Sequence, residues 1–419
     1  MTLGSRGRAG PGGPRRRTLL VLALATAIGS AGLAAGGTAG ALLGAELAGT
    51  DAAAGLPLGL LVVGQAAAAV LVSHRTSRVG RGRSLALGYV LGASGAALVV
   101  IAAASESLSA FLAGSVVLGA GNTSVFMTRF AAAEAGGEAS RGQALGAVFF
   151  ATALGAVASP GLLGPSGGLA QAVGLPPLAG LYVVALLCFV VAASLLWGTS
   201  NPATPYLGRV AALLGPPREA EVTRGEVALS FLGASSARAA VSILAAINLV
   251  MVAVMAVAPV HLVAHGHGLG VVGVVVGVHV AGMFMPSPLS GWAADRVGPT
   301  AIAGGGFLLM IASGAGGLLL NTGDALWMTA VLLVLGVGWN LGVVGGSALL
   351  ADSVPGRLRP RVEGIGEVSM GLAAGAGVPA AGLFVAFGGF PALSFAGTLV
   401  AAKAALALAF APAAARKAP

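Results

Sequence analysis

Residues 325–350 read ALWMTAVLLVLGVGWNLGVVGGSALL, and no charged side chain interrupts this run. A helix needs about 20 apolar residues to cross the roughly 30 Å of hydrocarbon in a bilayer, so the run is long enough to span one. Similar runs occur along the whole chain and bring the number of predicted spans to twelve. The other runs lie near residues 19–45, 56–73, 84–104, 108–128, 143–163, 177–198, 239–261, 268–291, 300–320, 364–386 and 392–411.

The composition agrees with a membrane location. Of the 419 residues, 57% are hydrophobic and only 8% are charged. A soluble protein of average composition has about 25% charged residues, so this chain cannot cover a water-facing surface. A closed β-barrel also crosses membranes, but it would show short segments of alternating polarity, and these runs do not alternate. We therefore predict an all-α membrane protein with twelve transmembrane helices.

The basic residues favour one orientation in the membrane. With an even number of spans both termini lie on one side, and the loops on the opposite side contain acids such as Glu46 and Asp324 but no Lys or Arg. Because cytoplasmic loops carry the excess of Lys and Arg, we predict a multi-pass protein of the cell membrane with both termini in the cytoplasm. The net charge of +9 then anchors loops beside anionic lipid, and we expect no nucleic-acid partner. We assign Arg129 and Arg141 to these cytoplasmic loops, and only Lys403 to a span.

The two halves of the chain repeat each other. At an offset of 218 residues, Arg78-Val79-Gly80 matches Arg296-Val297-Gly298, and Asn122 matches Asn340. Six helices in each half make the repeats parallel, related by an axis along the membrane normal. We predict two pseudo-symmetric six-helix bundles at 19–198 and 239–411, joined by a cytoplasmic linker at 199–238. A disordered basic tail at 1–18 and a second cytoplasmic tail at 412–419 complete the organisation.

The sequence Gly291-Trp-Ala-Ala-Asp295-Arg296-Val-Gly298 resembles the G-x-x-x-D-R-x-G signature of the major facilitator superfamily. The resemblance implies a bacterial-type transporter with twelve helices. It also implies that Asp295 accepts hydrogen bonds from a helix N-terminus and a basic residue, and so latches one conformation. The repeat suggests the start of the fifth predicted helix and Arg141 as its partners. The residues of this predicted latch are Arg78, Gly80, Arg141, Gly291, Asp295, Arg296 and Gly298.

The first-half copy of the signature has Ser77 in place of the acid. We therefore expect an asymmetric latch, with Arg78 and Arg81 contacting lipid headgroups or acids such as Glu363.

The fifth predicted helix contains Gly146, Gly155 and Pro160 at spacings similar to the antiporter signature of the same superfamily, although Ser159 and Leu163 replace two glycines. Gly and Pro allow a helix to bend, which predicts a hinge here. Small residues also let helices pack closely in lipid, and this alternative stays open.

Polar side chains inside the spans are costly and are candidates for a functional site. Interhelical hydrogen bonding is the alternative role for each of them. The substrate-cavity candidates are Gln65, Asn122, Asn248, Met251, Met255, His279, Trp339 and Asn340. We consider His279 and Glu367 as candidates for proton coupling. The outer histidines do not have the spacing of a familiar metal-ligand set, so we expect no metal and no cofactor.

The sequence therefore predicts a secondary active transporter of a small organic solute that works by alternating access. Proton-coupled efflux of apolar or amphiphilic compounds is the leading interpretation. Uptake or facilitated diffusion of a sugar or metabolite is one alternative, and a non-transporting membrane receptor or scaffold is another. The chain has no phosphate-binding G-x-x-x-x-G-K-[ST] motif, so we expect neither ATP-driven transport nor enzymatic activity. The expected partners are the solute, protons and the bilayer, and we expect a monomer.

Overall fold

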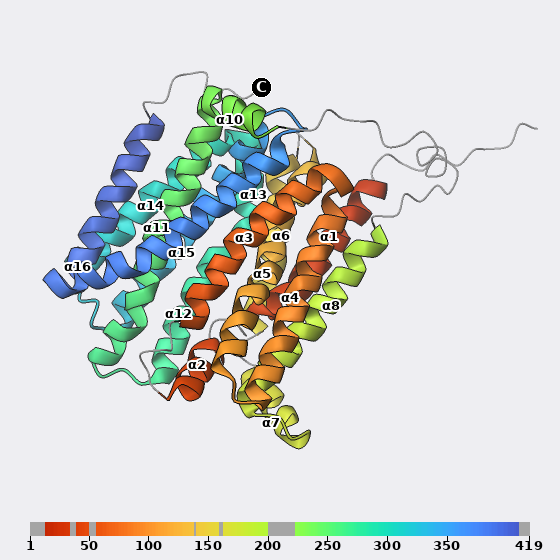
Figure 1. Ribbon diagram of the computed structural model, residues 1–419. Coiled ribbons are helices and arrows are strands. Elements are labelled where there is room, and N and C mark those ends of the chain that lie inside the picture. Colours follow the sequence, from red (N-terminus) through yellow and green to blue (C-terminus); the bar gives the residue numbers. More distant parts are fainter. Residues whose placement is uncertain are drawn as a thin grey trace, which may run out of the picture.

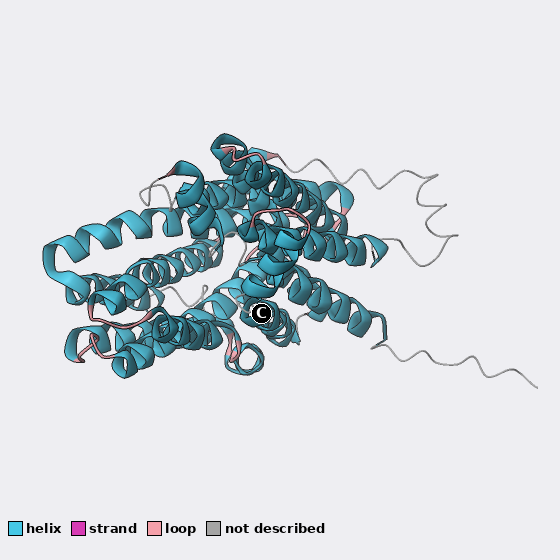
Figure 2. Ribbon diagram, turned by 90° about the horizontal axis from the view of Figure 1, so that it is seen from below, coloured by secondary structure: helices cyan, strands magenta, loops and turns pink. Residues whose placement is uncertain are grey.

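The computed structural model describes residues 13–33, 39–49, 56–137, 140–158, 162–199 and 223–409. Helices joined by short loops make up this part of the chain, and no strand occurs in it (Figure 2). Nine of the described helices are long and apolar enough to cross a membrane. The prediction of an all-α membrane fold is confirmed.

The helices form two bundles that lie side by side (Figure 1). The first bundle, coloured red to yellow-green, contains α1 (Gly13–Ala31), α2 (Gly40–Ala48), α3 (Leu56–Val79), α4 (Arg81–Ala104), α5 (Leu108–Gly136), α6 (Arg141–Ala158), α7 (Leu163–Ala172), the short 3-10 helix η5 (Pro177–Ala179) and α8 (Gly180–Thr199). The second, coloured green to blue, contains α10 (Arg224–Gly233), α11 (Ser235–Ala264), α12 (Leu269–Phe284), α13 (Ser287–Val297), α14 (Pro299–Leu319), α15 (Ala325–Asp352) and α16 (Arg359–Ala409).

Each of the twelve predicted runs overlaps one or two of these helices. The last two runs form α16, which kinks at Gly388 and Gly389, where Gly389 has a φ of 67°. The run at 268–291 is divided into α12 and α13 around Met285 and Pro286. The first run is divided between α1 and α2, and residues 34–38 lie outside the described residues.

Several boundaries differ from the prediction. α1 begins at Gly13, inside the segment 1–18 that we predicted as a tail, and residues 1–12 lie outside the described residues. The predicted linker at 199–238 contains α10 and the start of α11, and its residues 200–222, like 410–419 near the C-terminus, are not described. α5 continues to Gly136, beyond its predicted end at residue 128.

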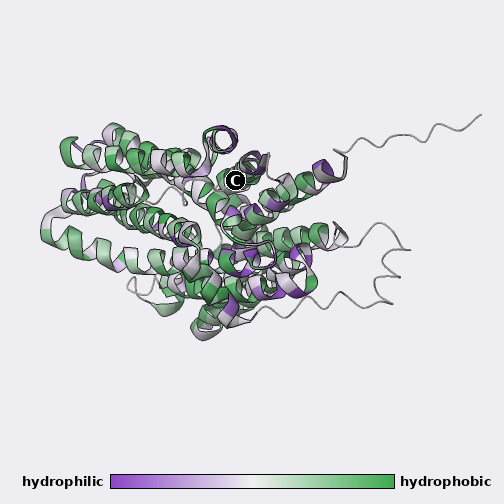
Figure 3. Cartoon of the chain, turned by 90° about the horizontal axis from the view of Figure 1, so that it is seen from above, coloured by the Kyte–Doolittle hydropathy of each residue, from purple (hydrophilic) through white to green (hydrophobic). Residues whose placement is uncertain are grey.

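Each bundle has its own apolar core. One core contains buried residues of the first bundle, among them Tyr89 and Phe189. The other core belongs mainly to the second bundle, and Phe130 and Phe149 of the first bundle are buried in it. Hydrophilic residues, purple in Figure 3, gather mainly toward one end of the helices, whereas green, hydrophobic residues dominate the rest of their length.

The turns at this polar end repeat between the bundles. Gly80 precedes α4 with a φ of 87°, and Gly298 precedes α14 with a φ of 93°. Side chains other than glycine rarely adopt such angles, so the backbone requires glycine at both positions. The equivalent turns agree with the offset of 218 found in the sequence.

Candidate functional site

The two bundles are tied together at the end whose loops carry most of the arginines, which we call the Arg-rich end. Asp295, in the last turn of α13, accepts hydrogen bonds from the backbone N–H groups of Gly142 (2.6 Å) and Gln143 (2.9 Å) at the start of α6. A helix N-terminus leaves N–H groups without partners and carries partial positive charge, so it stabilises a carboxylate. In the other bundle the equivalent Ser77 donates a hydrogen bond to the His74 carbonyl of its own helix (2.8 Å).

Close packing of α6 on α13 brings Asp295 to that helix start. A Cβ atom at Gly142 would overlap the carbonyl oxygen of Gly291, so only glycine allows the two backbones to approach this closely. The equivalent crossing lies between α3 and α16, where a Cβ atom at Gly364 would overlap the side chain of Ser73. Glycine contacts at two pseudo-symmetric helix crossings therefore join the bundles.

Ion pairs also join the two bundles at the Arg-rich end. Arg141, at the start of α6, pairs with Asp352 at the end of α15. Arg81 donates from Nη1 to Oε2 of Glu363 (2.6 Å) on α16 and from Nε to Oε2 of Glu134 (2.6 Å) on α5. Contact with Glu363 was one of the two alternatives expected for Arg81. Because Glu363 is buried and Glu134 is exposed, this cluster runs from the interior of the bundle to its surface.

The position of Arg129 differs from the prediction, which placed this residue in a loop and left Lys403 as the only basic residue inside a span. The structure buries Arg129 within α5, with 1% of the residue exposed. Its Nη2 atom pairs with Glu367 on α16, and its Nε donates to the Ser347 hydroxyl on α15 (3.0 Å). The prediction was wrong because we ended the apolar run at the charge of Arg129. The helix continues past this residue because Glu367 of the other bundle compensates the charge.

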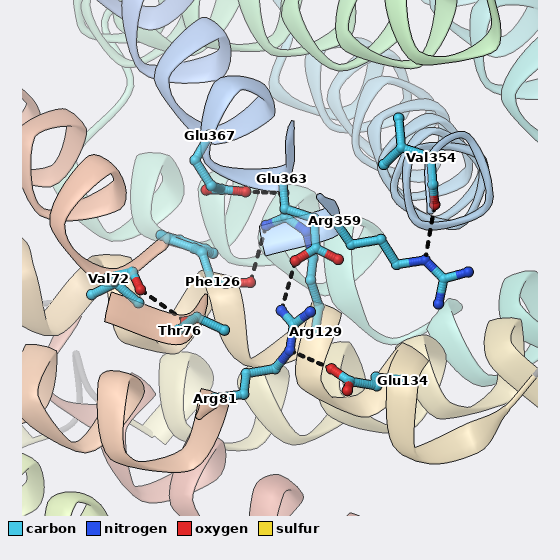
Figure 4. Close-up of polar contacts among 10 residues, drawn as sticks. All are labelled: Val72, Thr76, Arg81, Phe126, Arg129, Glu134, Val354, Arg359, Glu363 and Glu367. Atoms are coloured by element: carbon cyan, nitrogen blue, oxygen red, sulfur yellow. Dashed lines mark hydrogen bonds and ion pairs between the residues drawn. The ribbon is translucent and has the colours of Figure 1, made fainter. Parts of the chain in front are cut away.

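The pair between Arg129 and Glu367 borders a cavity of about 190 Å³ between the bundles. Helices α3, α5, α11, α12, α15 and α16 all contribute to its wall. Figure 4 shows Arg129 and Glu367 gathered in one cluster with Glu363 and Arg81. The lining residues are Val62, Gln65, Ala66, Phe126, Arg129, Asn248, Met251, Met283, Phe284, Trp339, Glu367, Met370, Gly371 and Ala374.

Aromatic rings and methionines make most of this wall apolar. Trp339 and Phe284 pack edge to face, with ring centroids 5.6 Å apart. The indole Nε1 of Trp339 donates to Oδ1 of Asn248 (3.2 Å), and Nδ2 of Asn248 donates to the Met370 carbonyl (2.9 Å). These polar groups are thus already bonded to one another, and the pair of Arg129 and Glu367 supplies the charges of the lining.

The structure brings four of the eight cavity candidates together. The candidates that line the cavity are Gln65, Asn248, Met251 and Trp339. The other four, Asn122, Met255, His279 and Asn340, lie outside its lining.

Contacts with neighbouring helices hold two of these four residues, His279 and Asn340. Buried His279 is bonded through Nδ1 to the Leu332 carbonyl of α15 (2.7 Å). Asn340 donates to the Met283 carbonyl and the Ser287 hydroxyl (both 2.6 Å), and so bridges the break between α12 and α13. The remaining two are buried Asn122 in α5 and half-buried Met255, which packs against the core of the second bundle.

The predicted hinge residues have packing roles in the described part of α6. A Cβ atom at Gly146 would overlap the Ser287 carbonyl of α13, and one at Gly155 would overlap the Ala27 carbonyl of α1. Close helix contact therefore accounts for both glycines, and a hinge stays a prediction. Pro160 lies outside the described residues.

The remaining latch candidates are Arg296 and Arg78. The guanidinium of Arg296 lies over the ring of Trp292, 4.4 Å from its centroid. Arg78 is in the last turn of α3.

A sequence model of the Major Facilitator Superfamily matches residues 19–344 and 239–419. The MFS-type transporter YddS of Bacillus subtilis is 32% identical over 385 residues, which cover 92% of this chain and 88% of the relative. YdeG of the same organism is also 32% identical, over 92% of this chain and 89% of its own length. The riboflavin transporter RfnT of Brucella anthropi is 25% identical, over 85% of each chain.

Solved structures share the same fold. The human organic anion transporter MFSD10 superposes with a TM-score of 0.72 at 18% identity, covering 94% of this chain and 99% of that one. The transporter FucP in its outward conformation gives a TM-score of 0.69 at 14% identity, covering 95% and 99%. At these identities the likeness concerns the fold alone.

Proposed function

Because the chain belongs to the major facilitator superfamily, we propose that it is a secondary active transporter of a small amphiphilic solute, working by alternating access. The observation that carries this proposal is the pair of Arg129 and Glu367, which links the two bundles at a largely apolar cavity. The relatives named above are transporters and not enzymes.

The contacts at the Arg-rich end support a rocking mechanism. Asp295, Arg141 and Arg81 each contact the opposite bundle there. We take this end as cytoplasmic because of its arginines, so the described arrangement is closed toward the cytoplasm. Transport requires these contacts to break while the solute remains in the cavity.

Glu367 is the group that we assign to proton coupling. Protonation would remove its charge and leave buried Arg129 without its ionic partner. Breaking a buried pair in this way typically costs about 3–5 kcal/mol, so protonation would weaken the link between α5 and α16. His279, the other candidate, lies outside the cavity lining and has no such link across the bundles.

The lining favours an amphiphilic solute over a sugar. A sugar needs many hydrogen-bonding partners, whereas most of the lining residues are apolar, including Phe, Met and Trp residues, and Asn248 is already bonded on both sides. A planar aromatic ring would fit beside Trp339 and Phe284, and the relative RfnT is named for riboflavin, which contains such a ring system. In proton-coupled efflux, the leading expectation from the sequence, solute and protons cross the membrane in opposite directions. In proton-coupled uptake they cross it in the same direction.

Reconstitution into liposomes tests this proposal. Solutes would first be selected by the thermal stabilisation that they give the purified protein, and their flux would then be measured under an imposed pH gradient. We expect gradient-driven accumulation, its loss in Glu367→Gln, and its retention in the matched control His279→Gln. Loss in His279→Gln with retention in Glu367→Gln would contradict the assignment. Solute binding without flux would favour the receptor or scaffold.

A further inference from the structure

We infer that the cavity binds an aromatic or other amphiphilic organic anion through Arg129, and that this anion binds together with a proton on Glu367. This inference rests on the proposed function. It specifies the class of the transported solute and the relative direction in which solute and proton cross the membrane. Arg129 and Glu367 are the charged residues that line the cavity, so the lining is neutral overall while both are ionised.

The positive charge of Arg129 is permanent. A guanidinium does not lose its proton in proteins, so only the carboxylate of the pair can change its charge. When Glu367 is protonated, the cavity carries one buried positive charge. An anion that enters the cavity then restores neutrality.

The hydrogen bonds of Arg129 show how an anion would be held. Nε donates to Ser347, and Nη1 donates to the Phe126 carbonyl (3.1 Å). Nη2 donates to Oε1 of Glu367 and contacts Sδ of Met370 (3.5 Å). The bonds to Ser347 and Phe126 fix the guanidinium at the cavity wall, whereas the Nη2 position is held by the one partner whose charge can change. A ligand carboxylate that replaces Glu367 there would form the same kind of charge-assisted bond.

The rest of the lining suits the apolar part of such a ligand. Phe126, Phe284 and Trp339 present aromatic rings, and Met251 and Met283 present adaptable thioether chains. A molecule with a ring and a carboxylate would place the ring against these side chains and the carboxylate at Arg129. The cavity thus offers complementary surfaces to both ends of an aromatic acid.

The charged groups around Glu367 determine how its protonation depends on pH. Glu363 lies one helical turn before Glu367 on α16 and is paired with Arg81 of α4, which also binds Glu134 of α5. The lining residues from α3, α11, α12 and α15 carry no charge. Arg129 is therefore the charged group from another helix that faces Glu367 in the cavity. An anion that binds Arg129 in place of Glu367 takes away the partner of the ionised carboxylate and so favours its protonation.

Proton and anion binding are consequently cooperative. Binding of the anion favours protonation, and protonation favours binding of the anion. The two would cross the membrane in the same direction, which corresponds to the uptake alternative, whereas proton-driven efflux requires them to compete.

Calorimetry with benzoate and its uncharged analogue benzamide tests this inference. The purified full-length protein would be titrated near neutral pH in two buffers of different ionisation enthalpy, which gives the number of protons taken up. We expect about one proton per benzoate in the wild type. We expect no uptake in Glu367→Gln, which should bind benzoate about tenfold more tightly or better because the competing carboxylate is gone. Benzamide should bind both proteins without proton uptake.

The double variant Arg129→Gln/Glu367→Gln provides the matched control, since it removes both charges and leaves no buried ion alone. The double variant should still bind benzamide, and it should not bind benzoate more tightly than benzamide. Benzoate binding without proton uptake, or no benzoate binding by a Glu367→Gln protein that retains its thermal transition, would overturn the inference. Gradient-driven transport of uncharged solutes alone would overturn this inference and leave the proposed function intact, whereas absence of all gradient-driven transport would overturn the proposed function.

Discussion

At the scale of single residues, we propose that the bond between Asp295 and the start of α6 contributes modestly and reversibly to closure of the Arg-rich end. A carboxylate at a helix N-terminus stabilises by about 0.3–1 kcal/mol, which corresponds to about a two- to fivefold change in a population. A bond of this size biases the equilibrium between two conformations without fixing it. The side chain of Asp295 is not deeply buried, which agrees with the reversible contact that we propose.

Asp295→Asn should therefore shift the population away from closure of the Arg-rich end by about two- to fivefold, because the charge at the helix terminus is lost. Spin labels at Val79→Cys and Val297→Cys, equivalent positions in the two bundles, would report the distance across this end in a Cys188→Ser background. Asp324→Asn is the matched control, since Asp324 accepts from Leu326 (2.8 Å) at the start of α15 within one bundle. Equal distance distributions in both variants would contradict a role for Asp295 in the latch.

At the scale of helices, the crossing of α6 and α13 positions Asp295 at the start of α6 through backbone contact. Gly142→Ala should open the Arg-rich end, because the added methyl group would overlap the Gly291 carbonyl and force the bundles apart. The same pair of spin labels measures this change. Gly164→Ala on α7, where a Cβ atom would meet no neighbour within 4 Å, should leave the distances unchanged. If the distances between the labels in Gly142→Ala were the same as in the wild type, the crossing would tolerate a side chain.

The helices also show what the sequence could and could not predict. Apolar run length located the spans, and the repeat located the helix start that Asp295 contacts. Run length failed at Arg129, because its partner Glu367 is 238 residues away in the chain. The repeat contained the missing signal, since Arg129 is equivalent to Ser347, which lies inside the run 325–350. The contacts of His279 and Asn340 with neighbouring helices depend on packing details that no sequence pattern reveals.

At the scale of the whole molecule, the arginines predict the orientation in the membrane. A cysteine at Asn321, in the loop between α14 and α15 at the opposite end, should react with impermeant thiol reagents from outside the cell. A cysteine at Pro355, in the loop between α15 and α16 at the Arg-rich end, should not. Both variants require the Cys188→Ser background. Reaction at position 355 and protection at 321 would reverse the orientation.

The proposed transport mechanism depends on Glu367 as the proton-sensitive link between the bundles. The distance between labels at Val79→Cys and Val297→Cys, measured at alkaline and acidic pH in lipid nanodiscs, tests this claim most directly. In the wild type the Arg-rich end should be closed at alkaline pH and more open at acidic pH, because protonation of Glu367 breaks its pair with Arg129. Glu367→Gln should be more open at both pH values and insensitive to the change. A Glu367→Gln protein with the same pH response as the wild type would contradict the account.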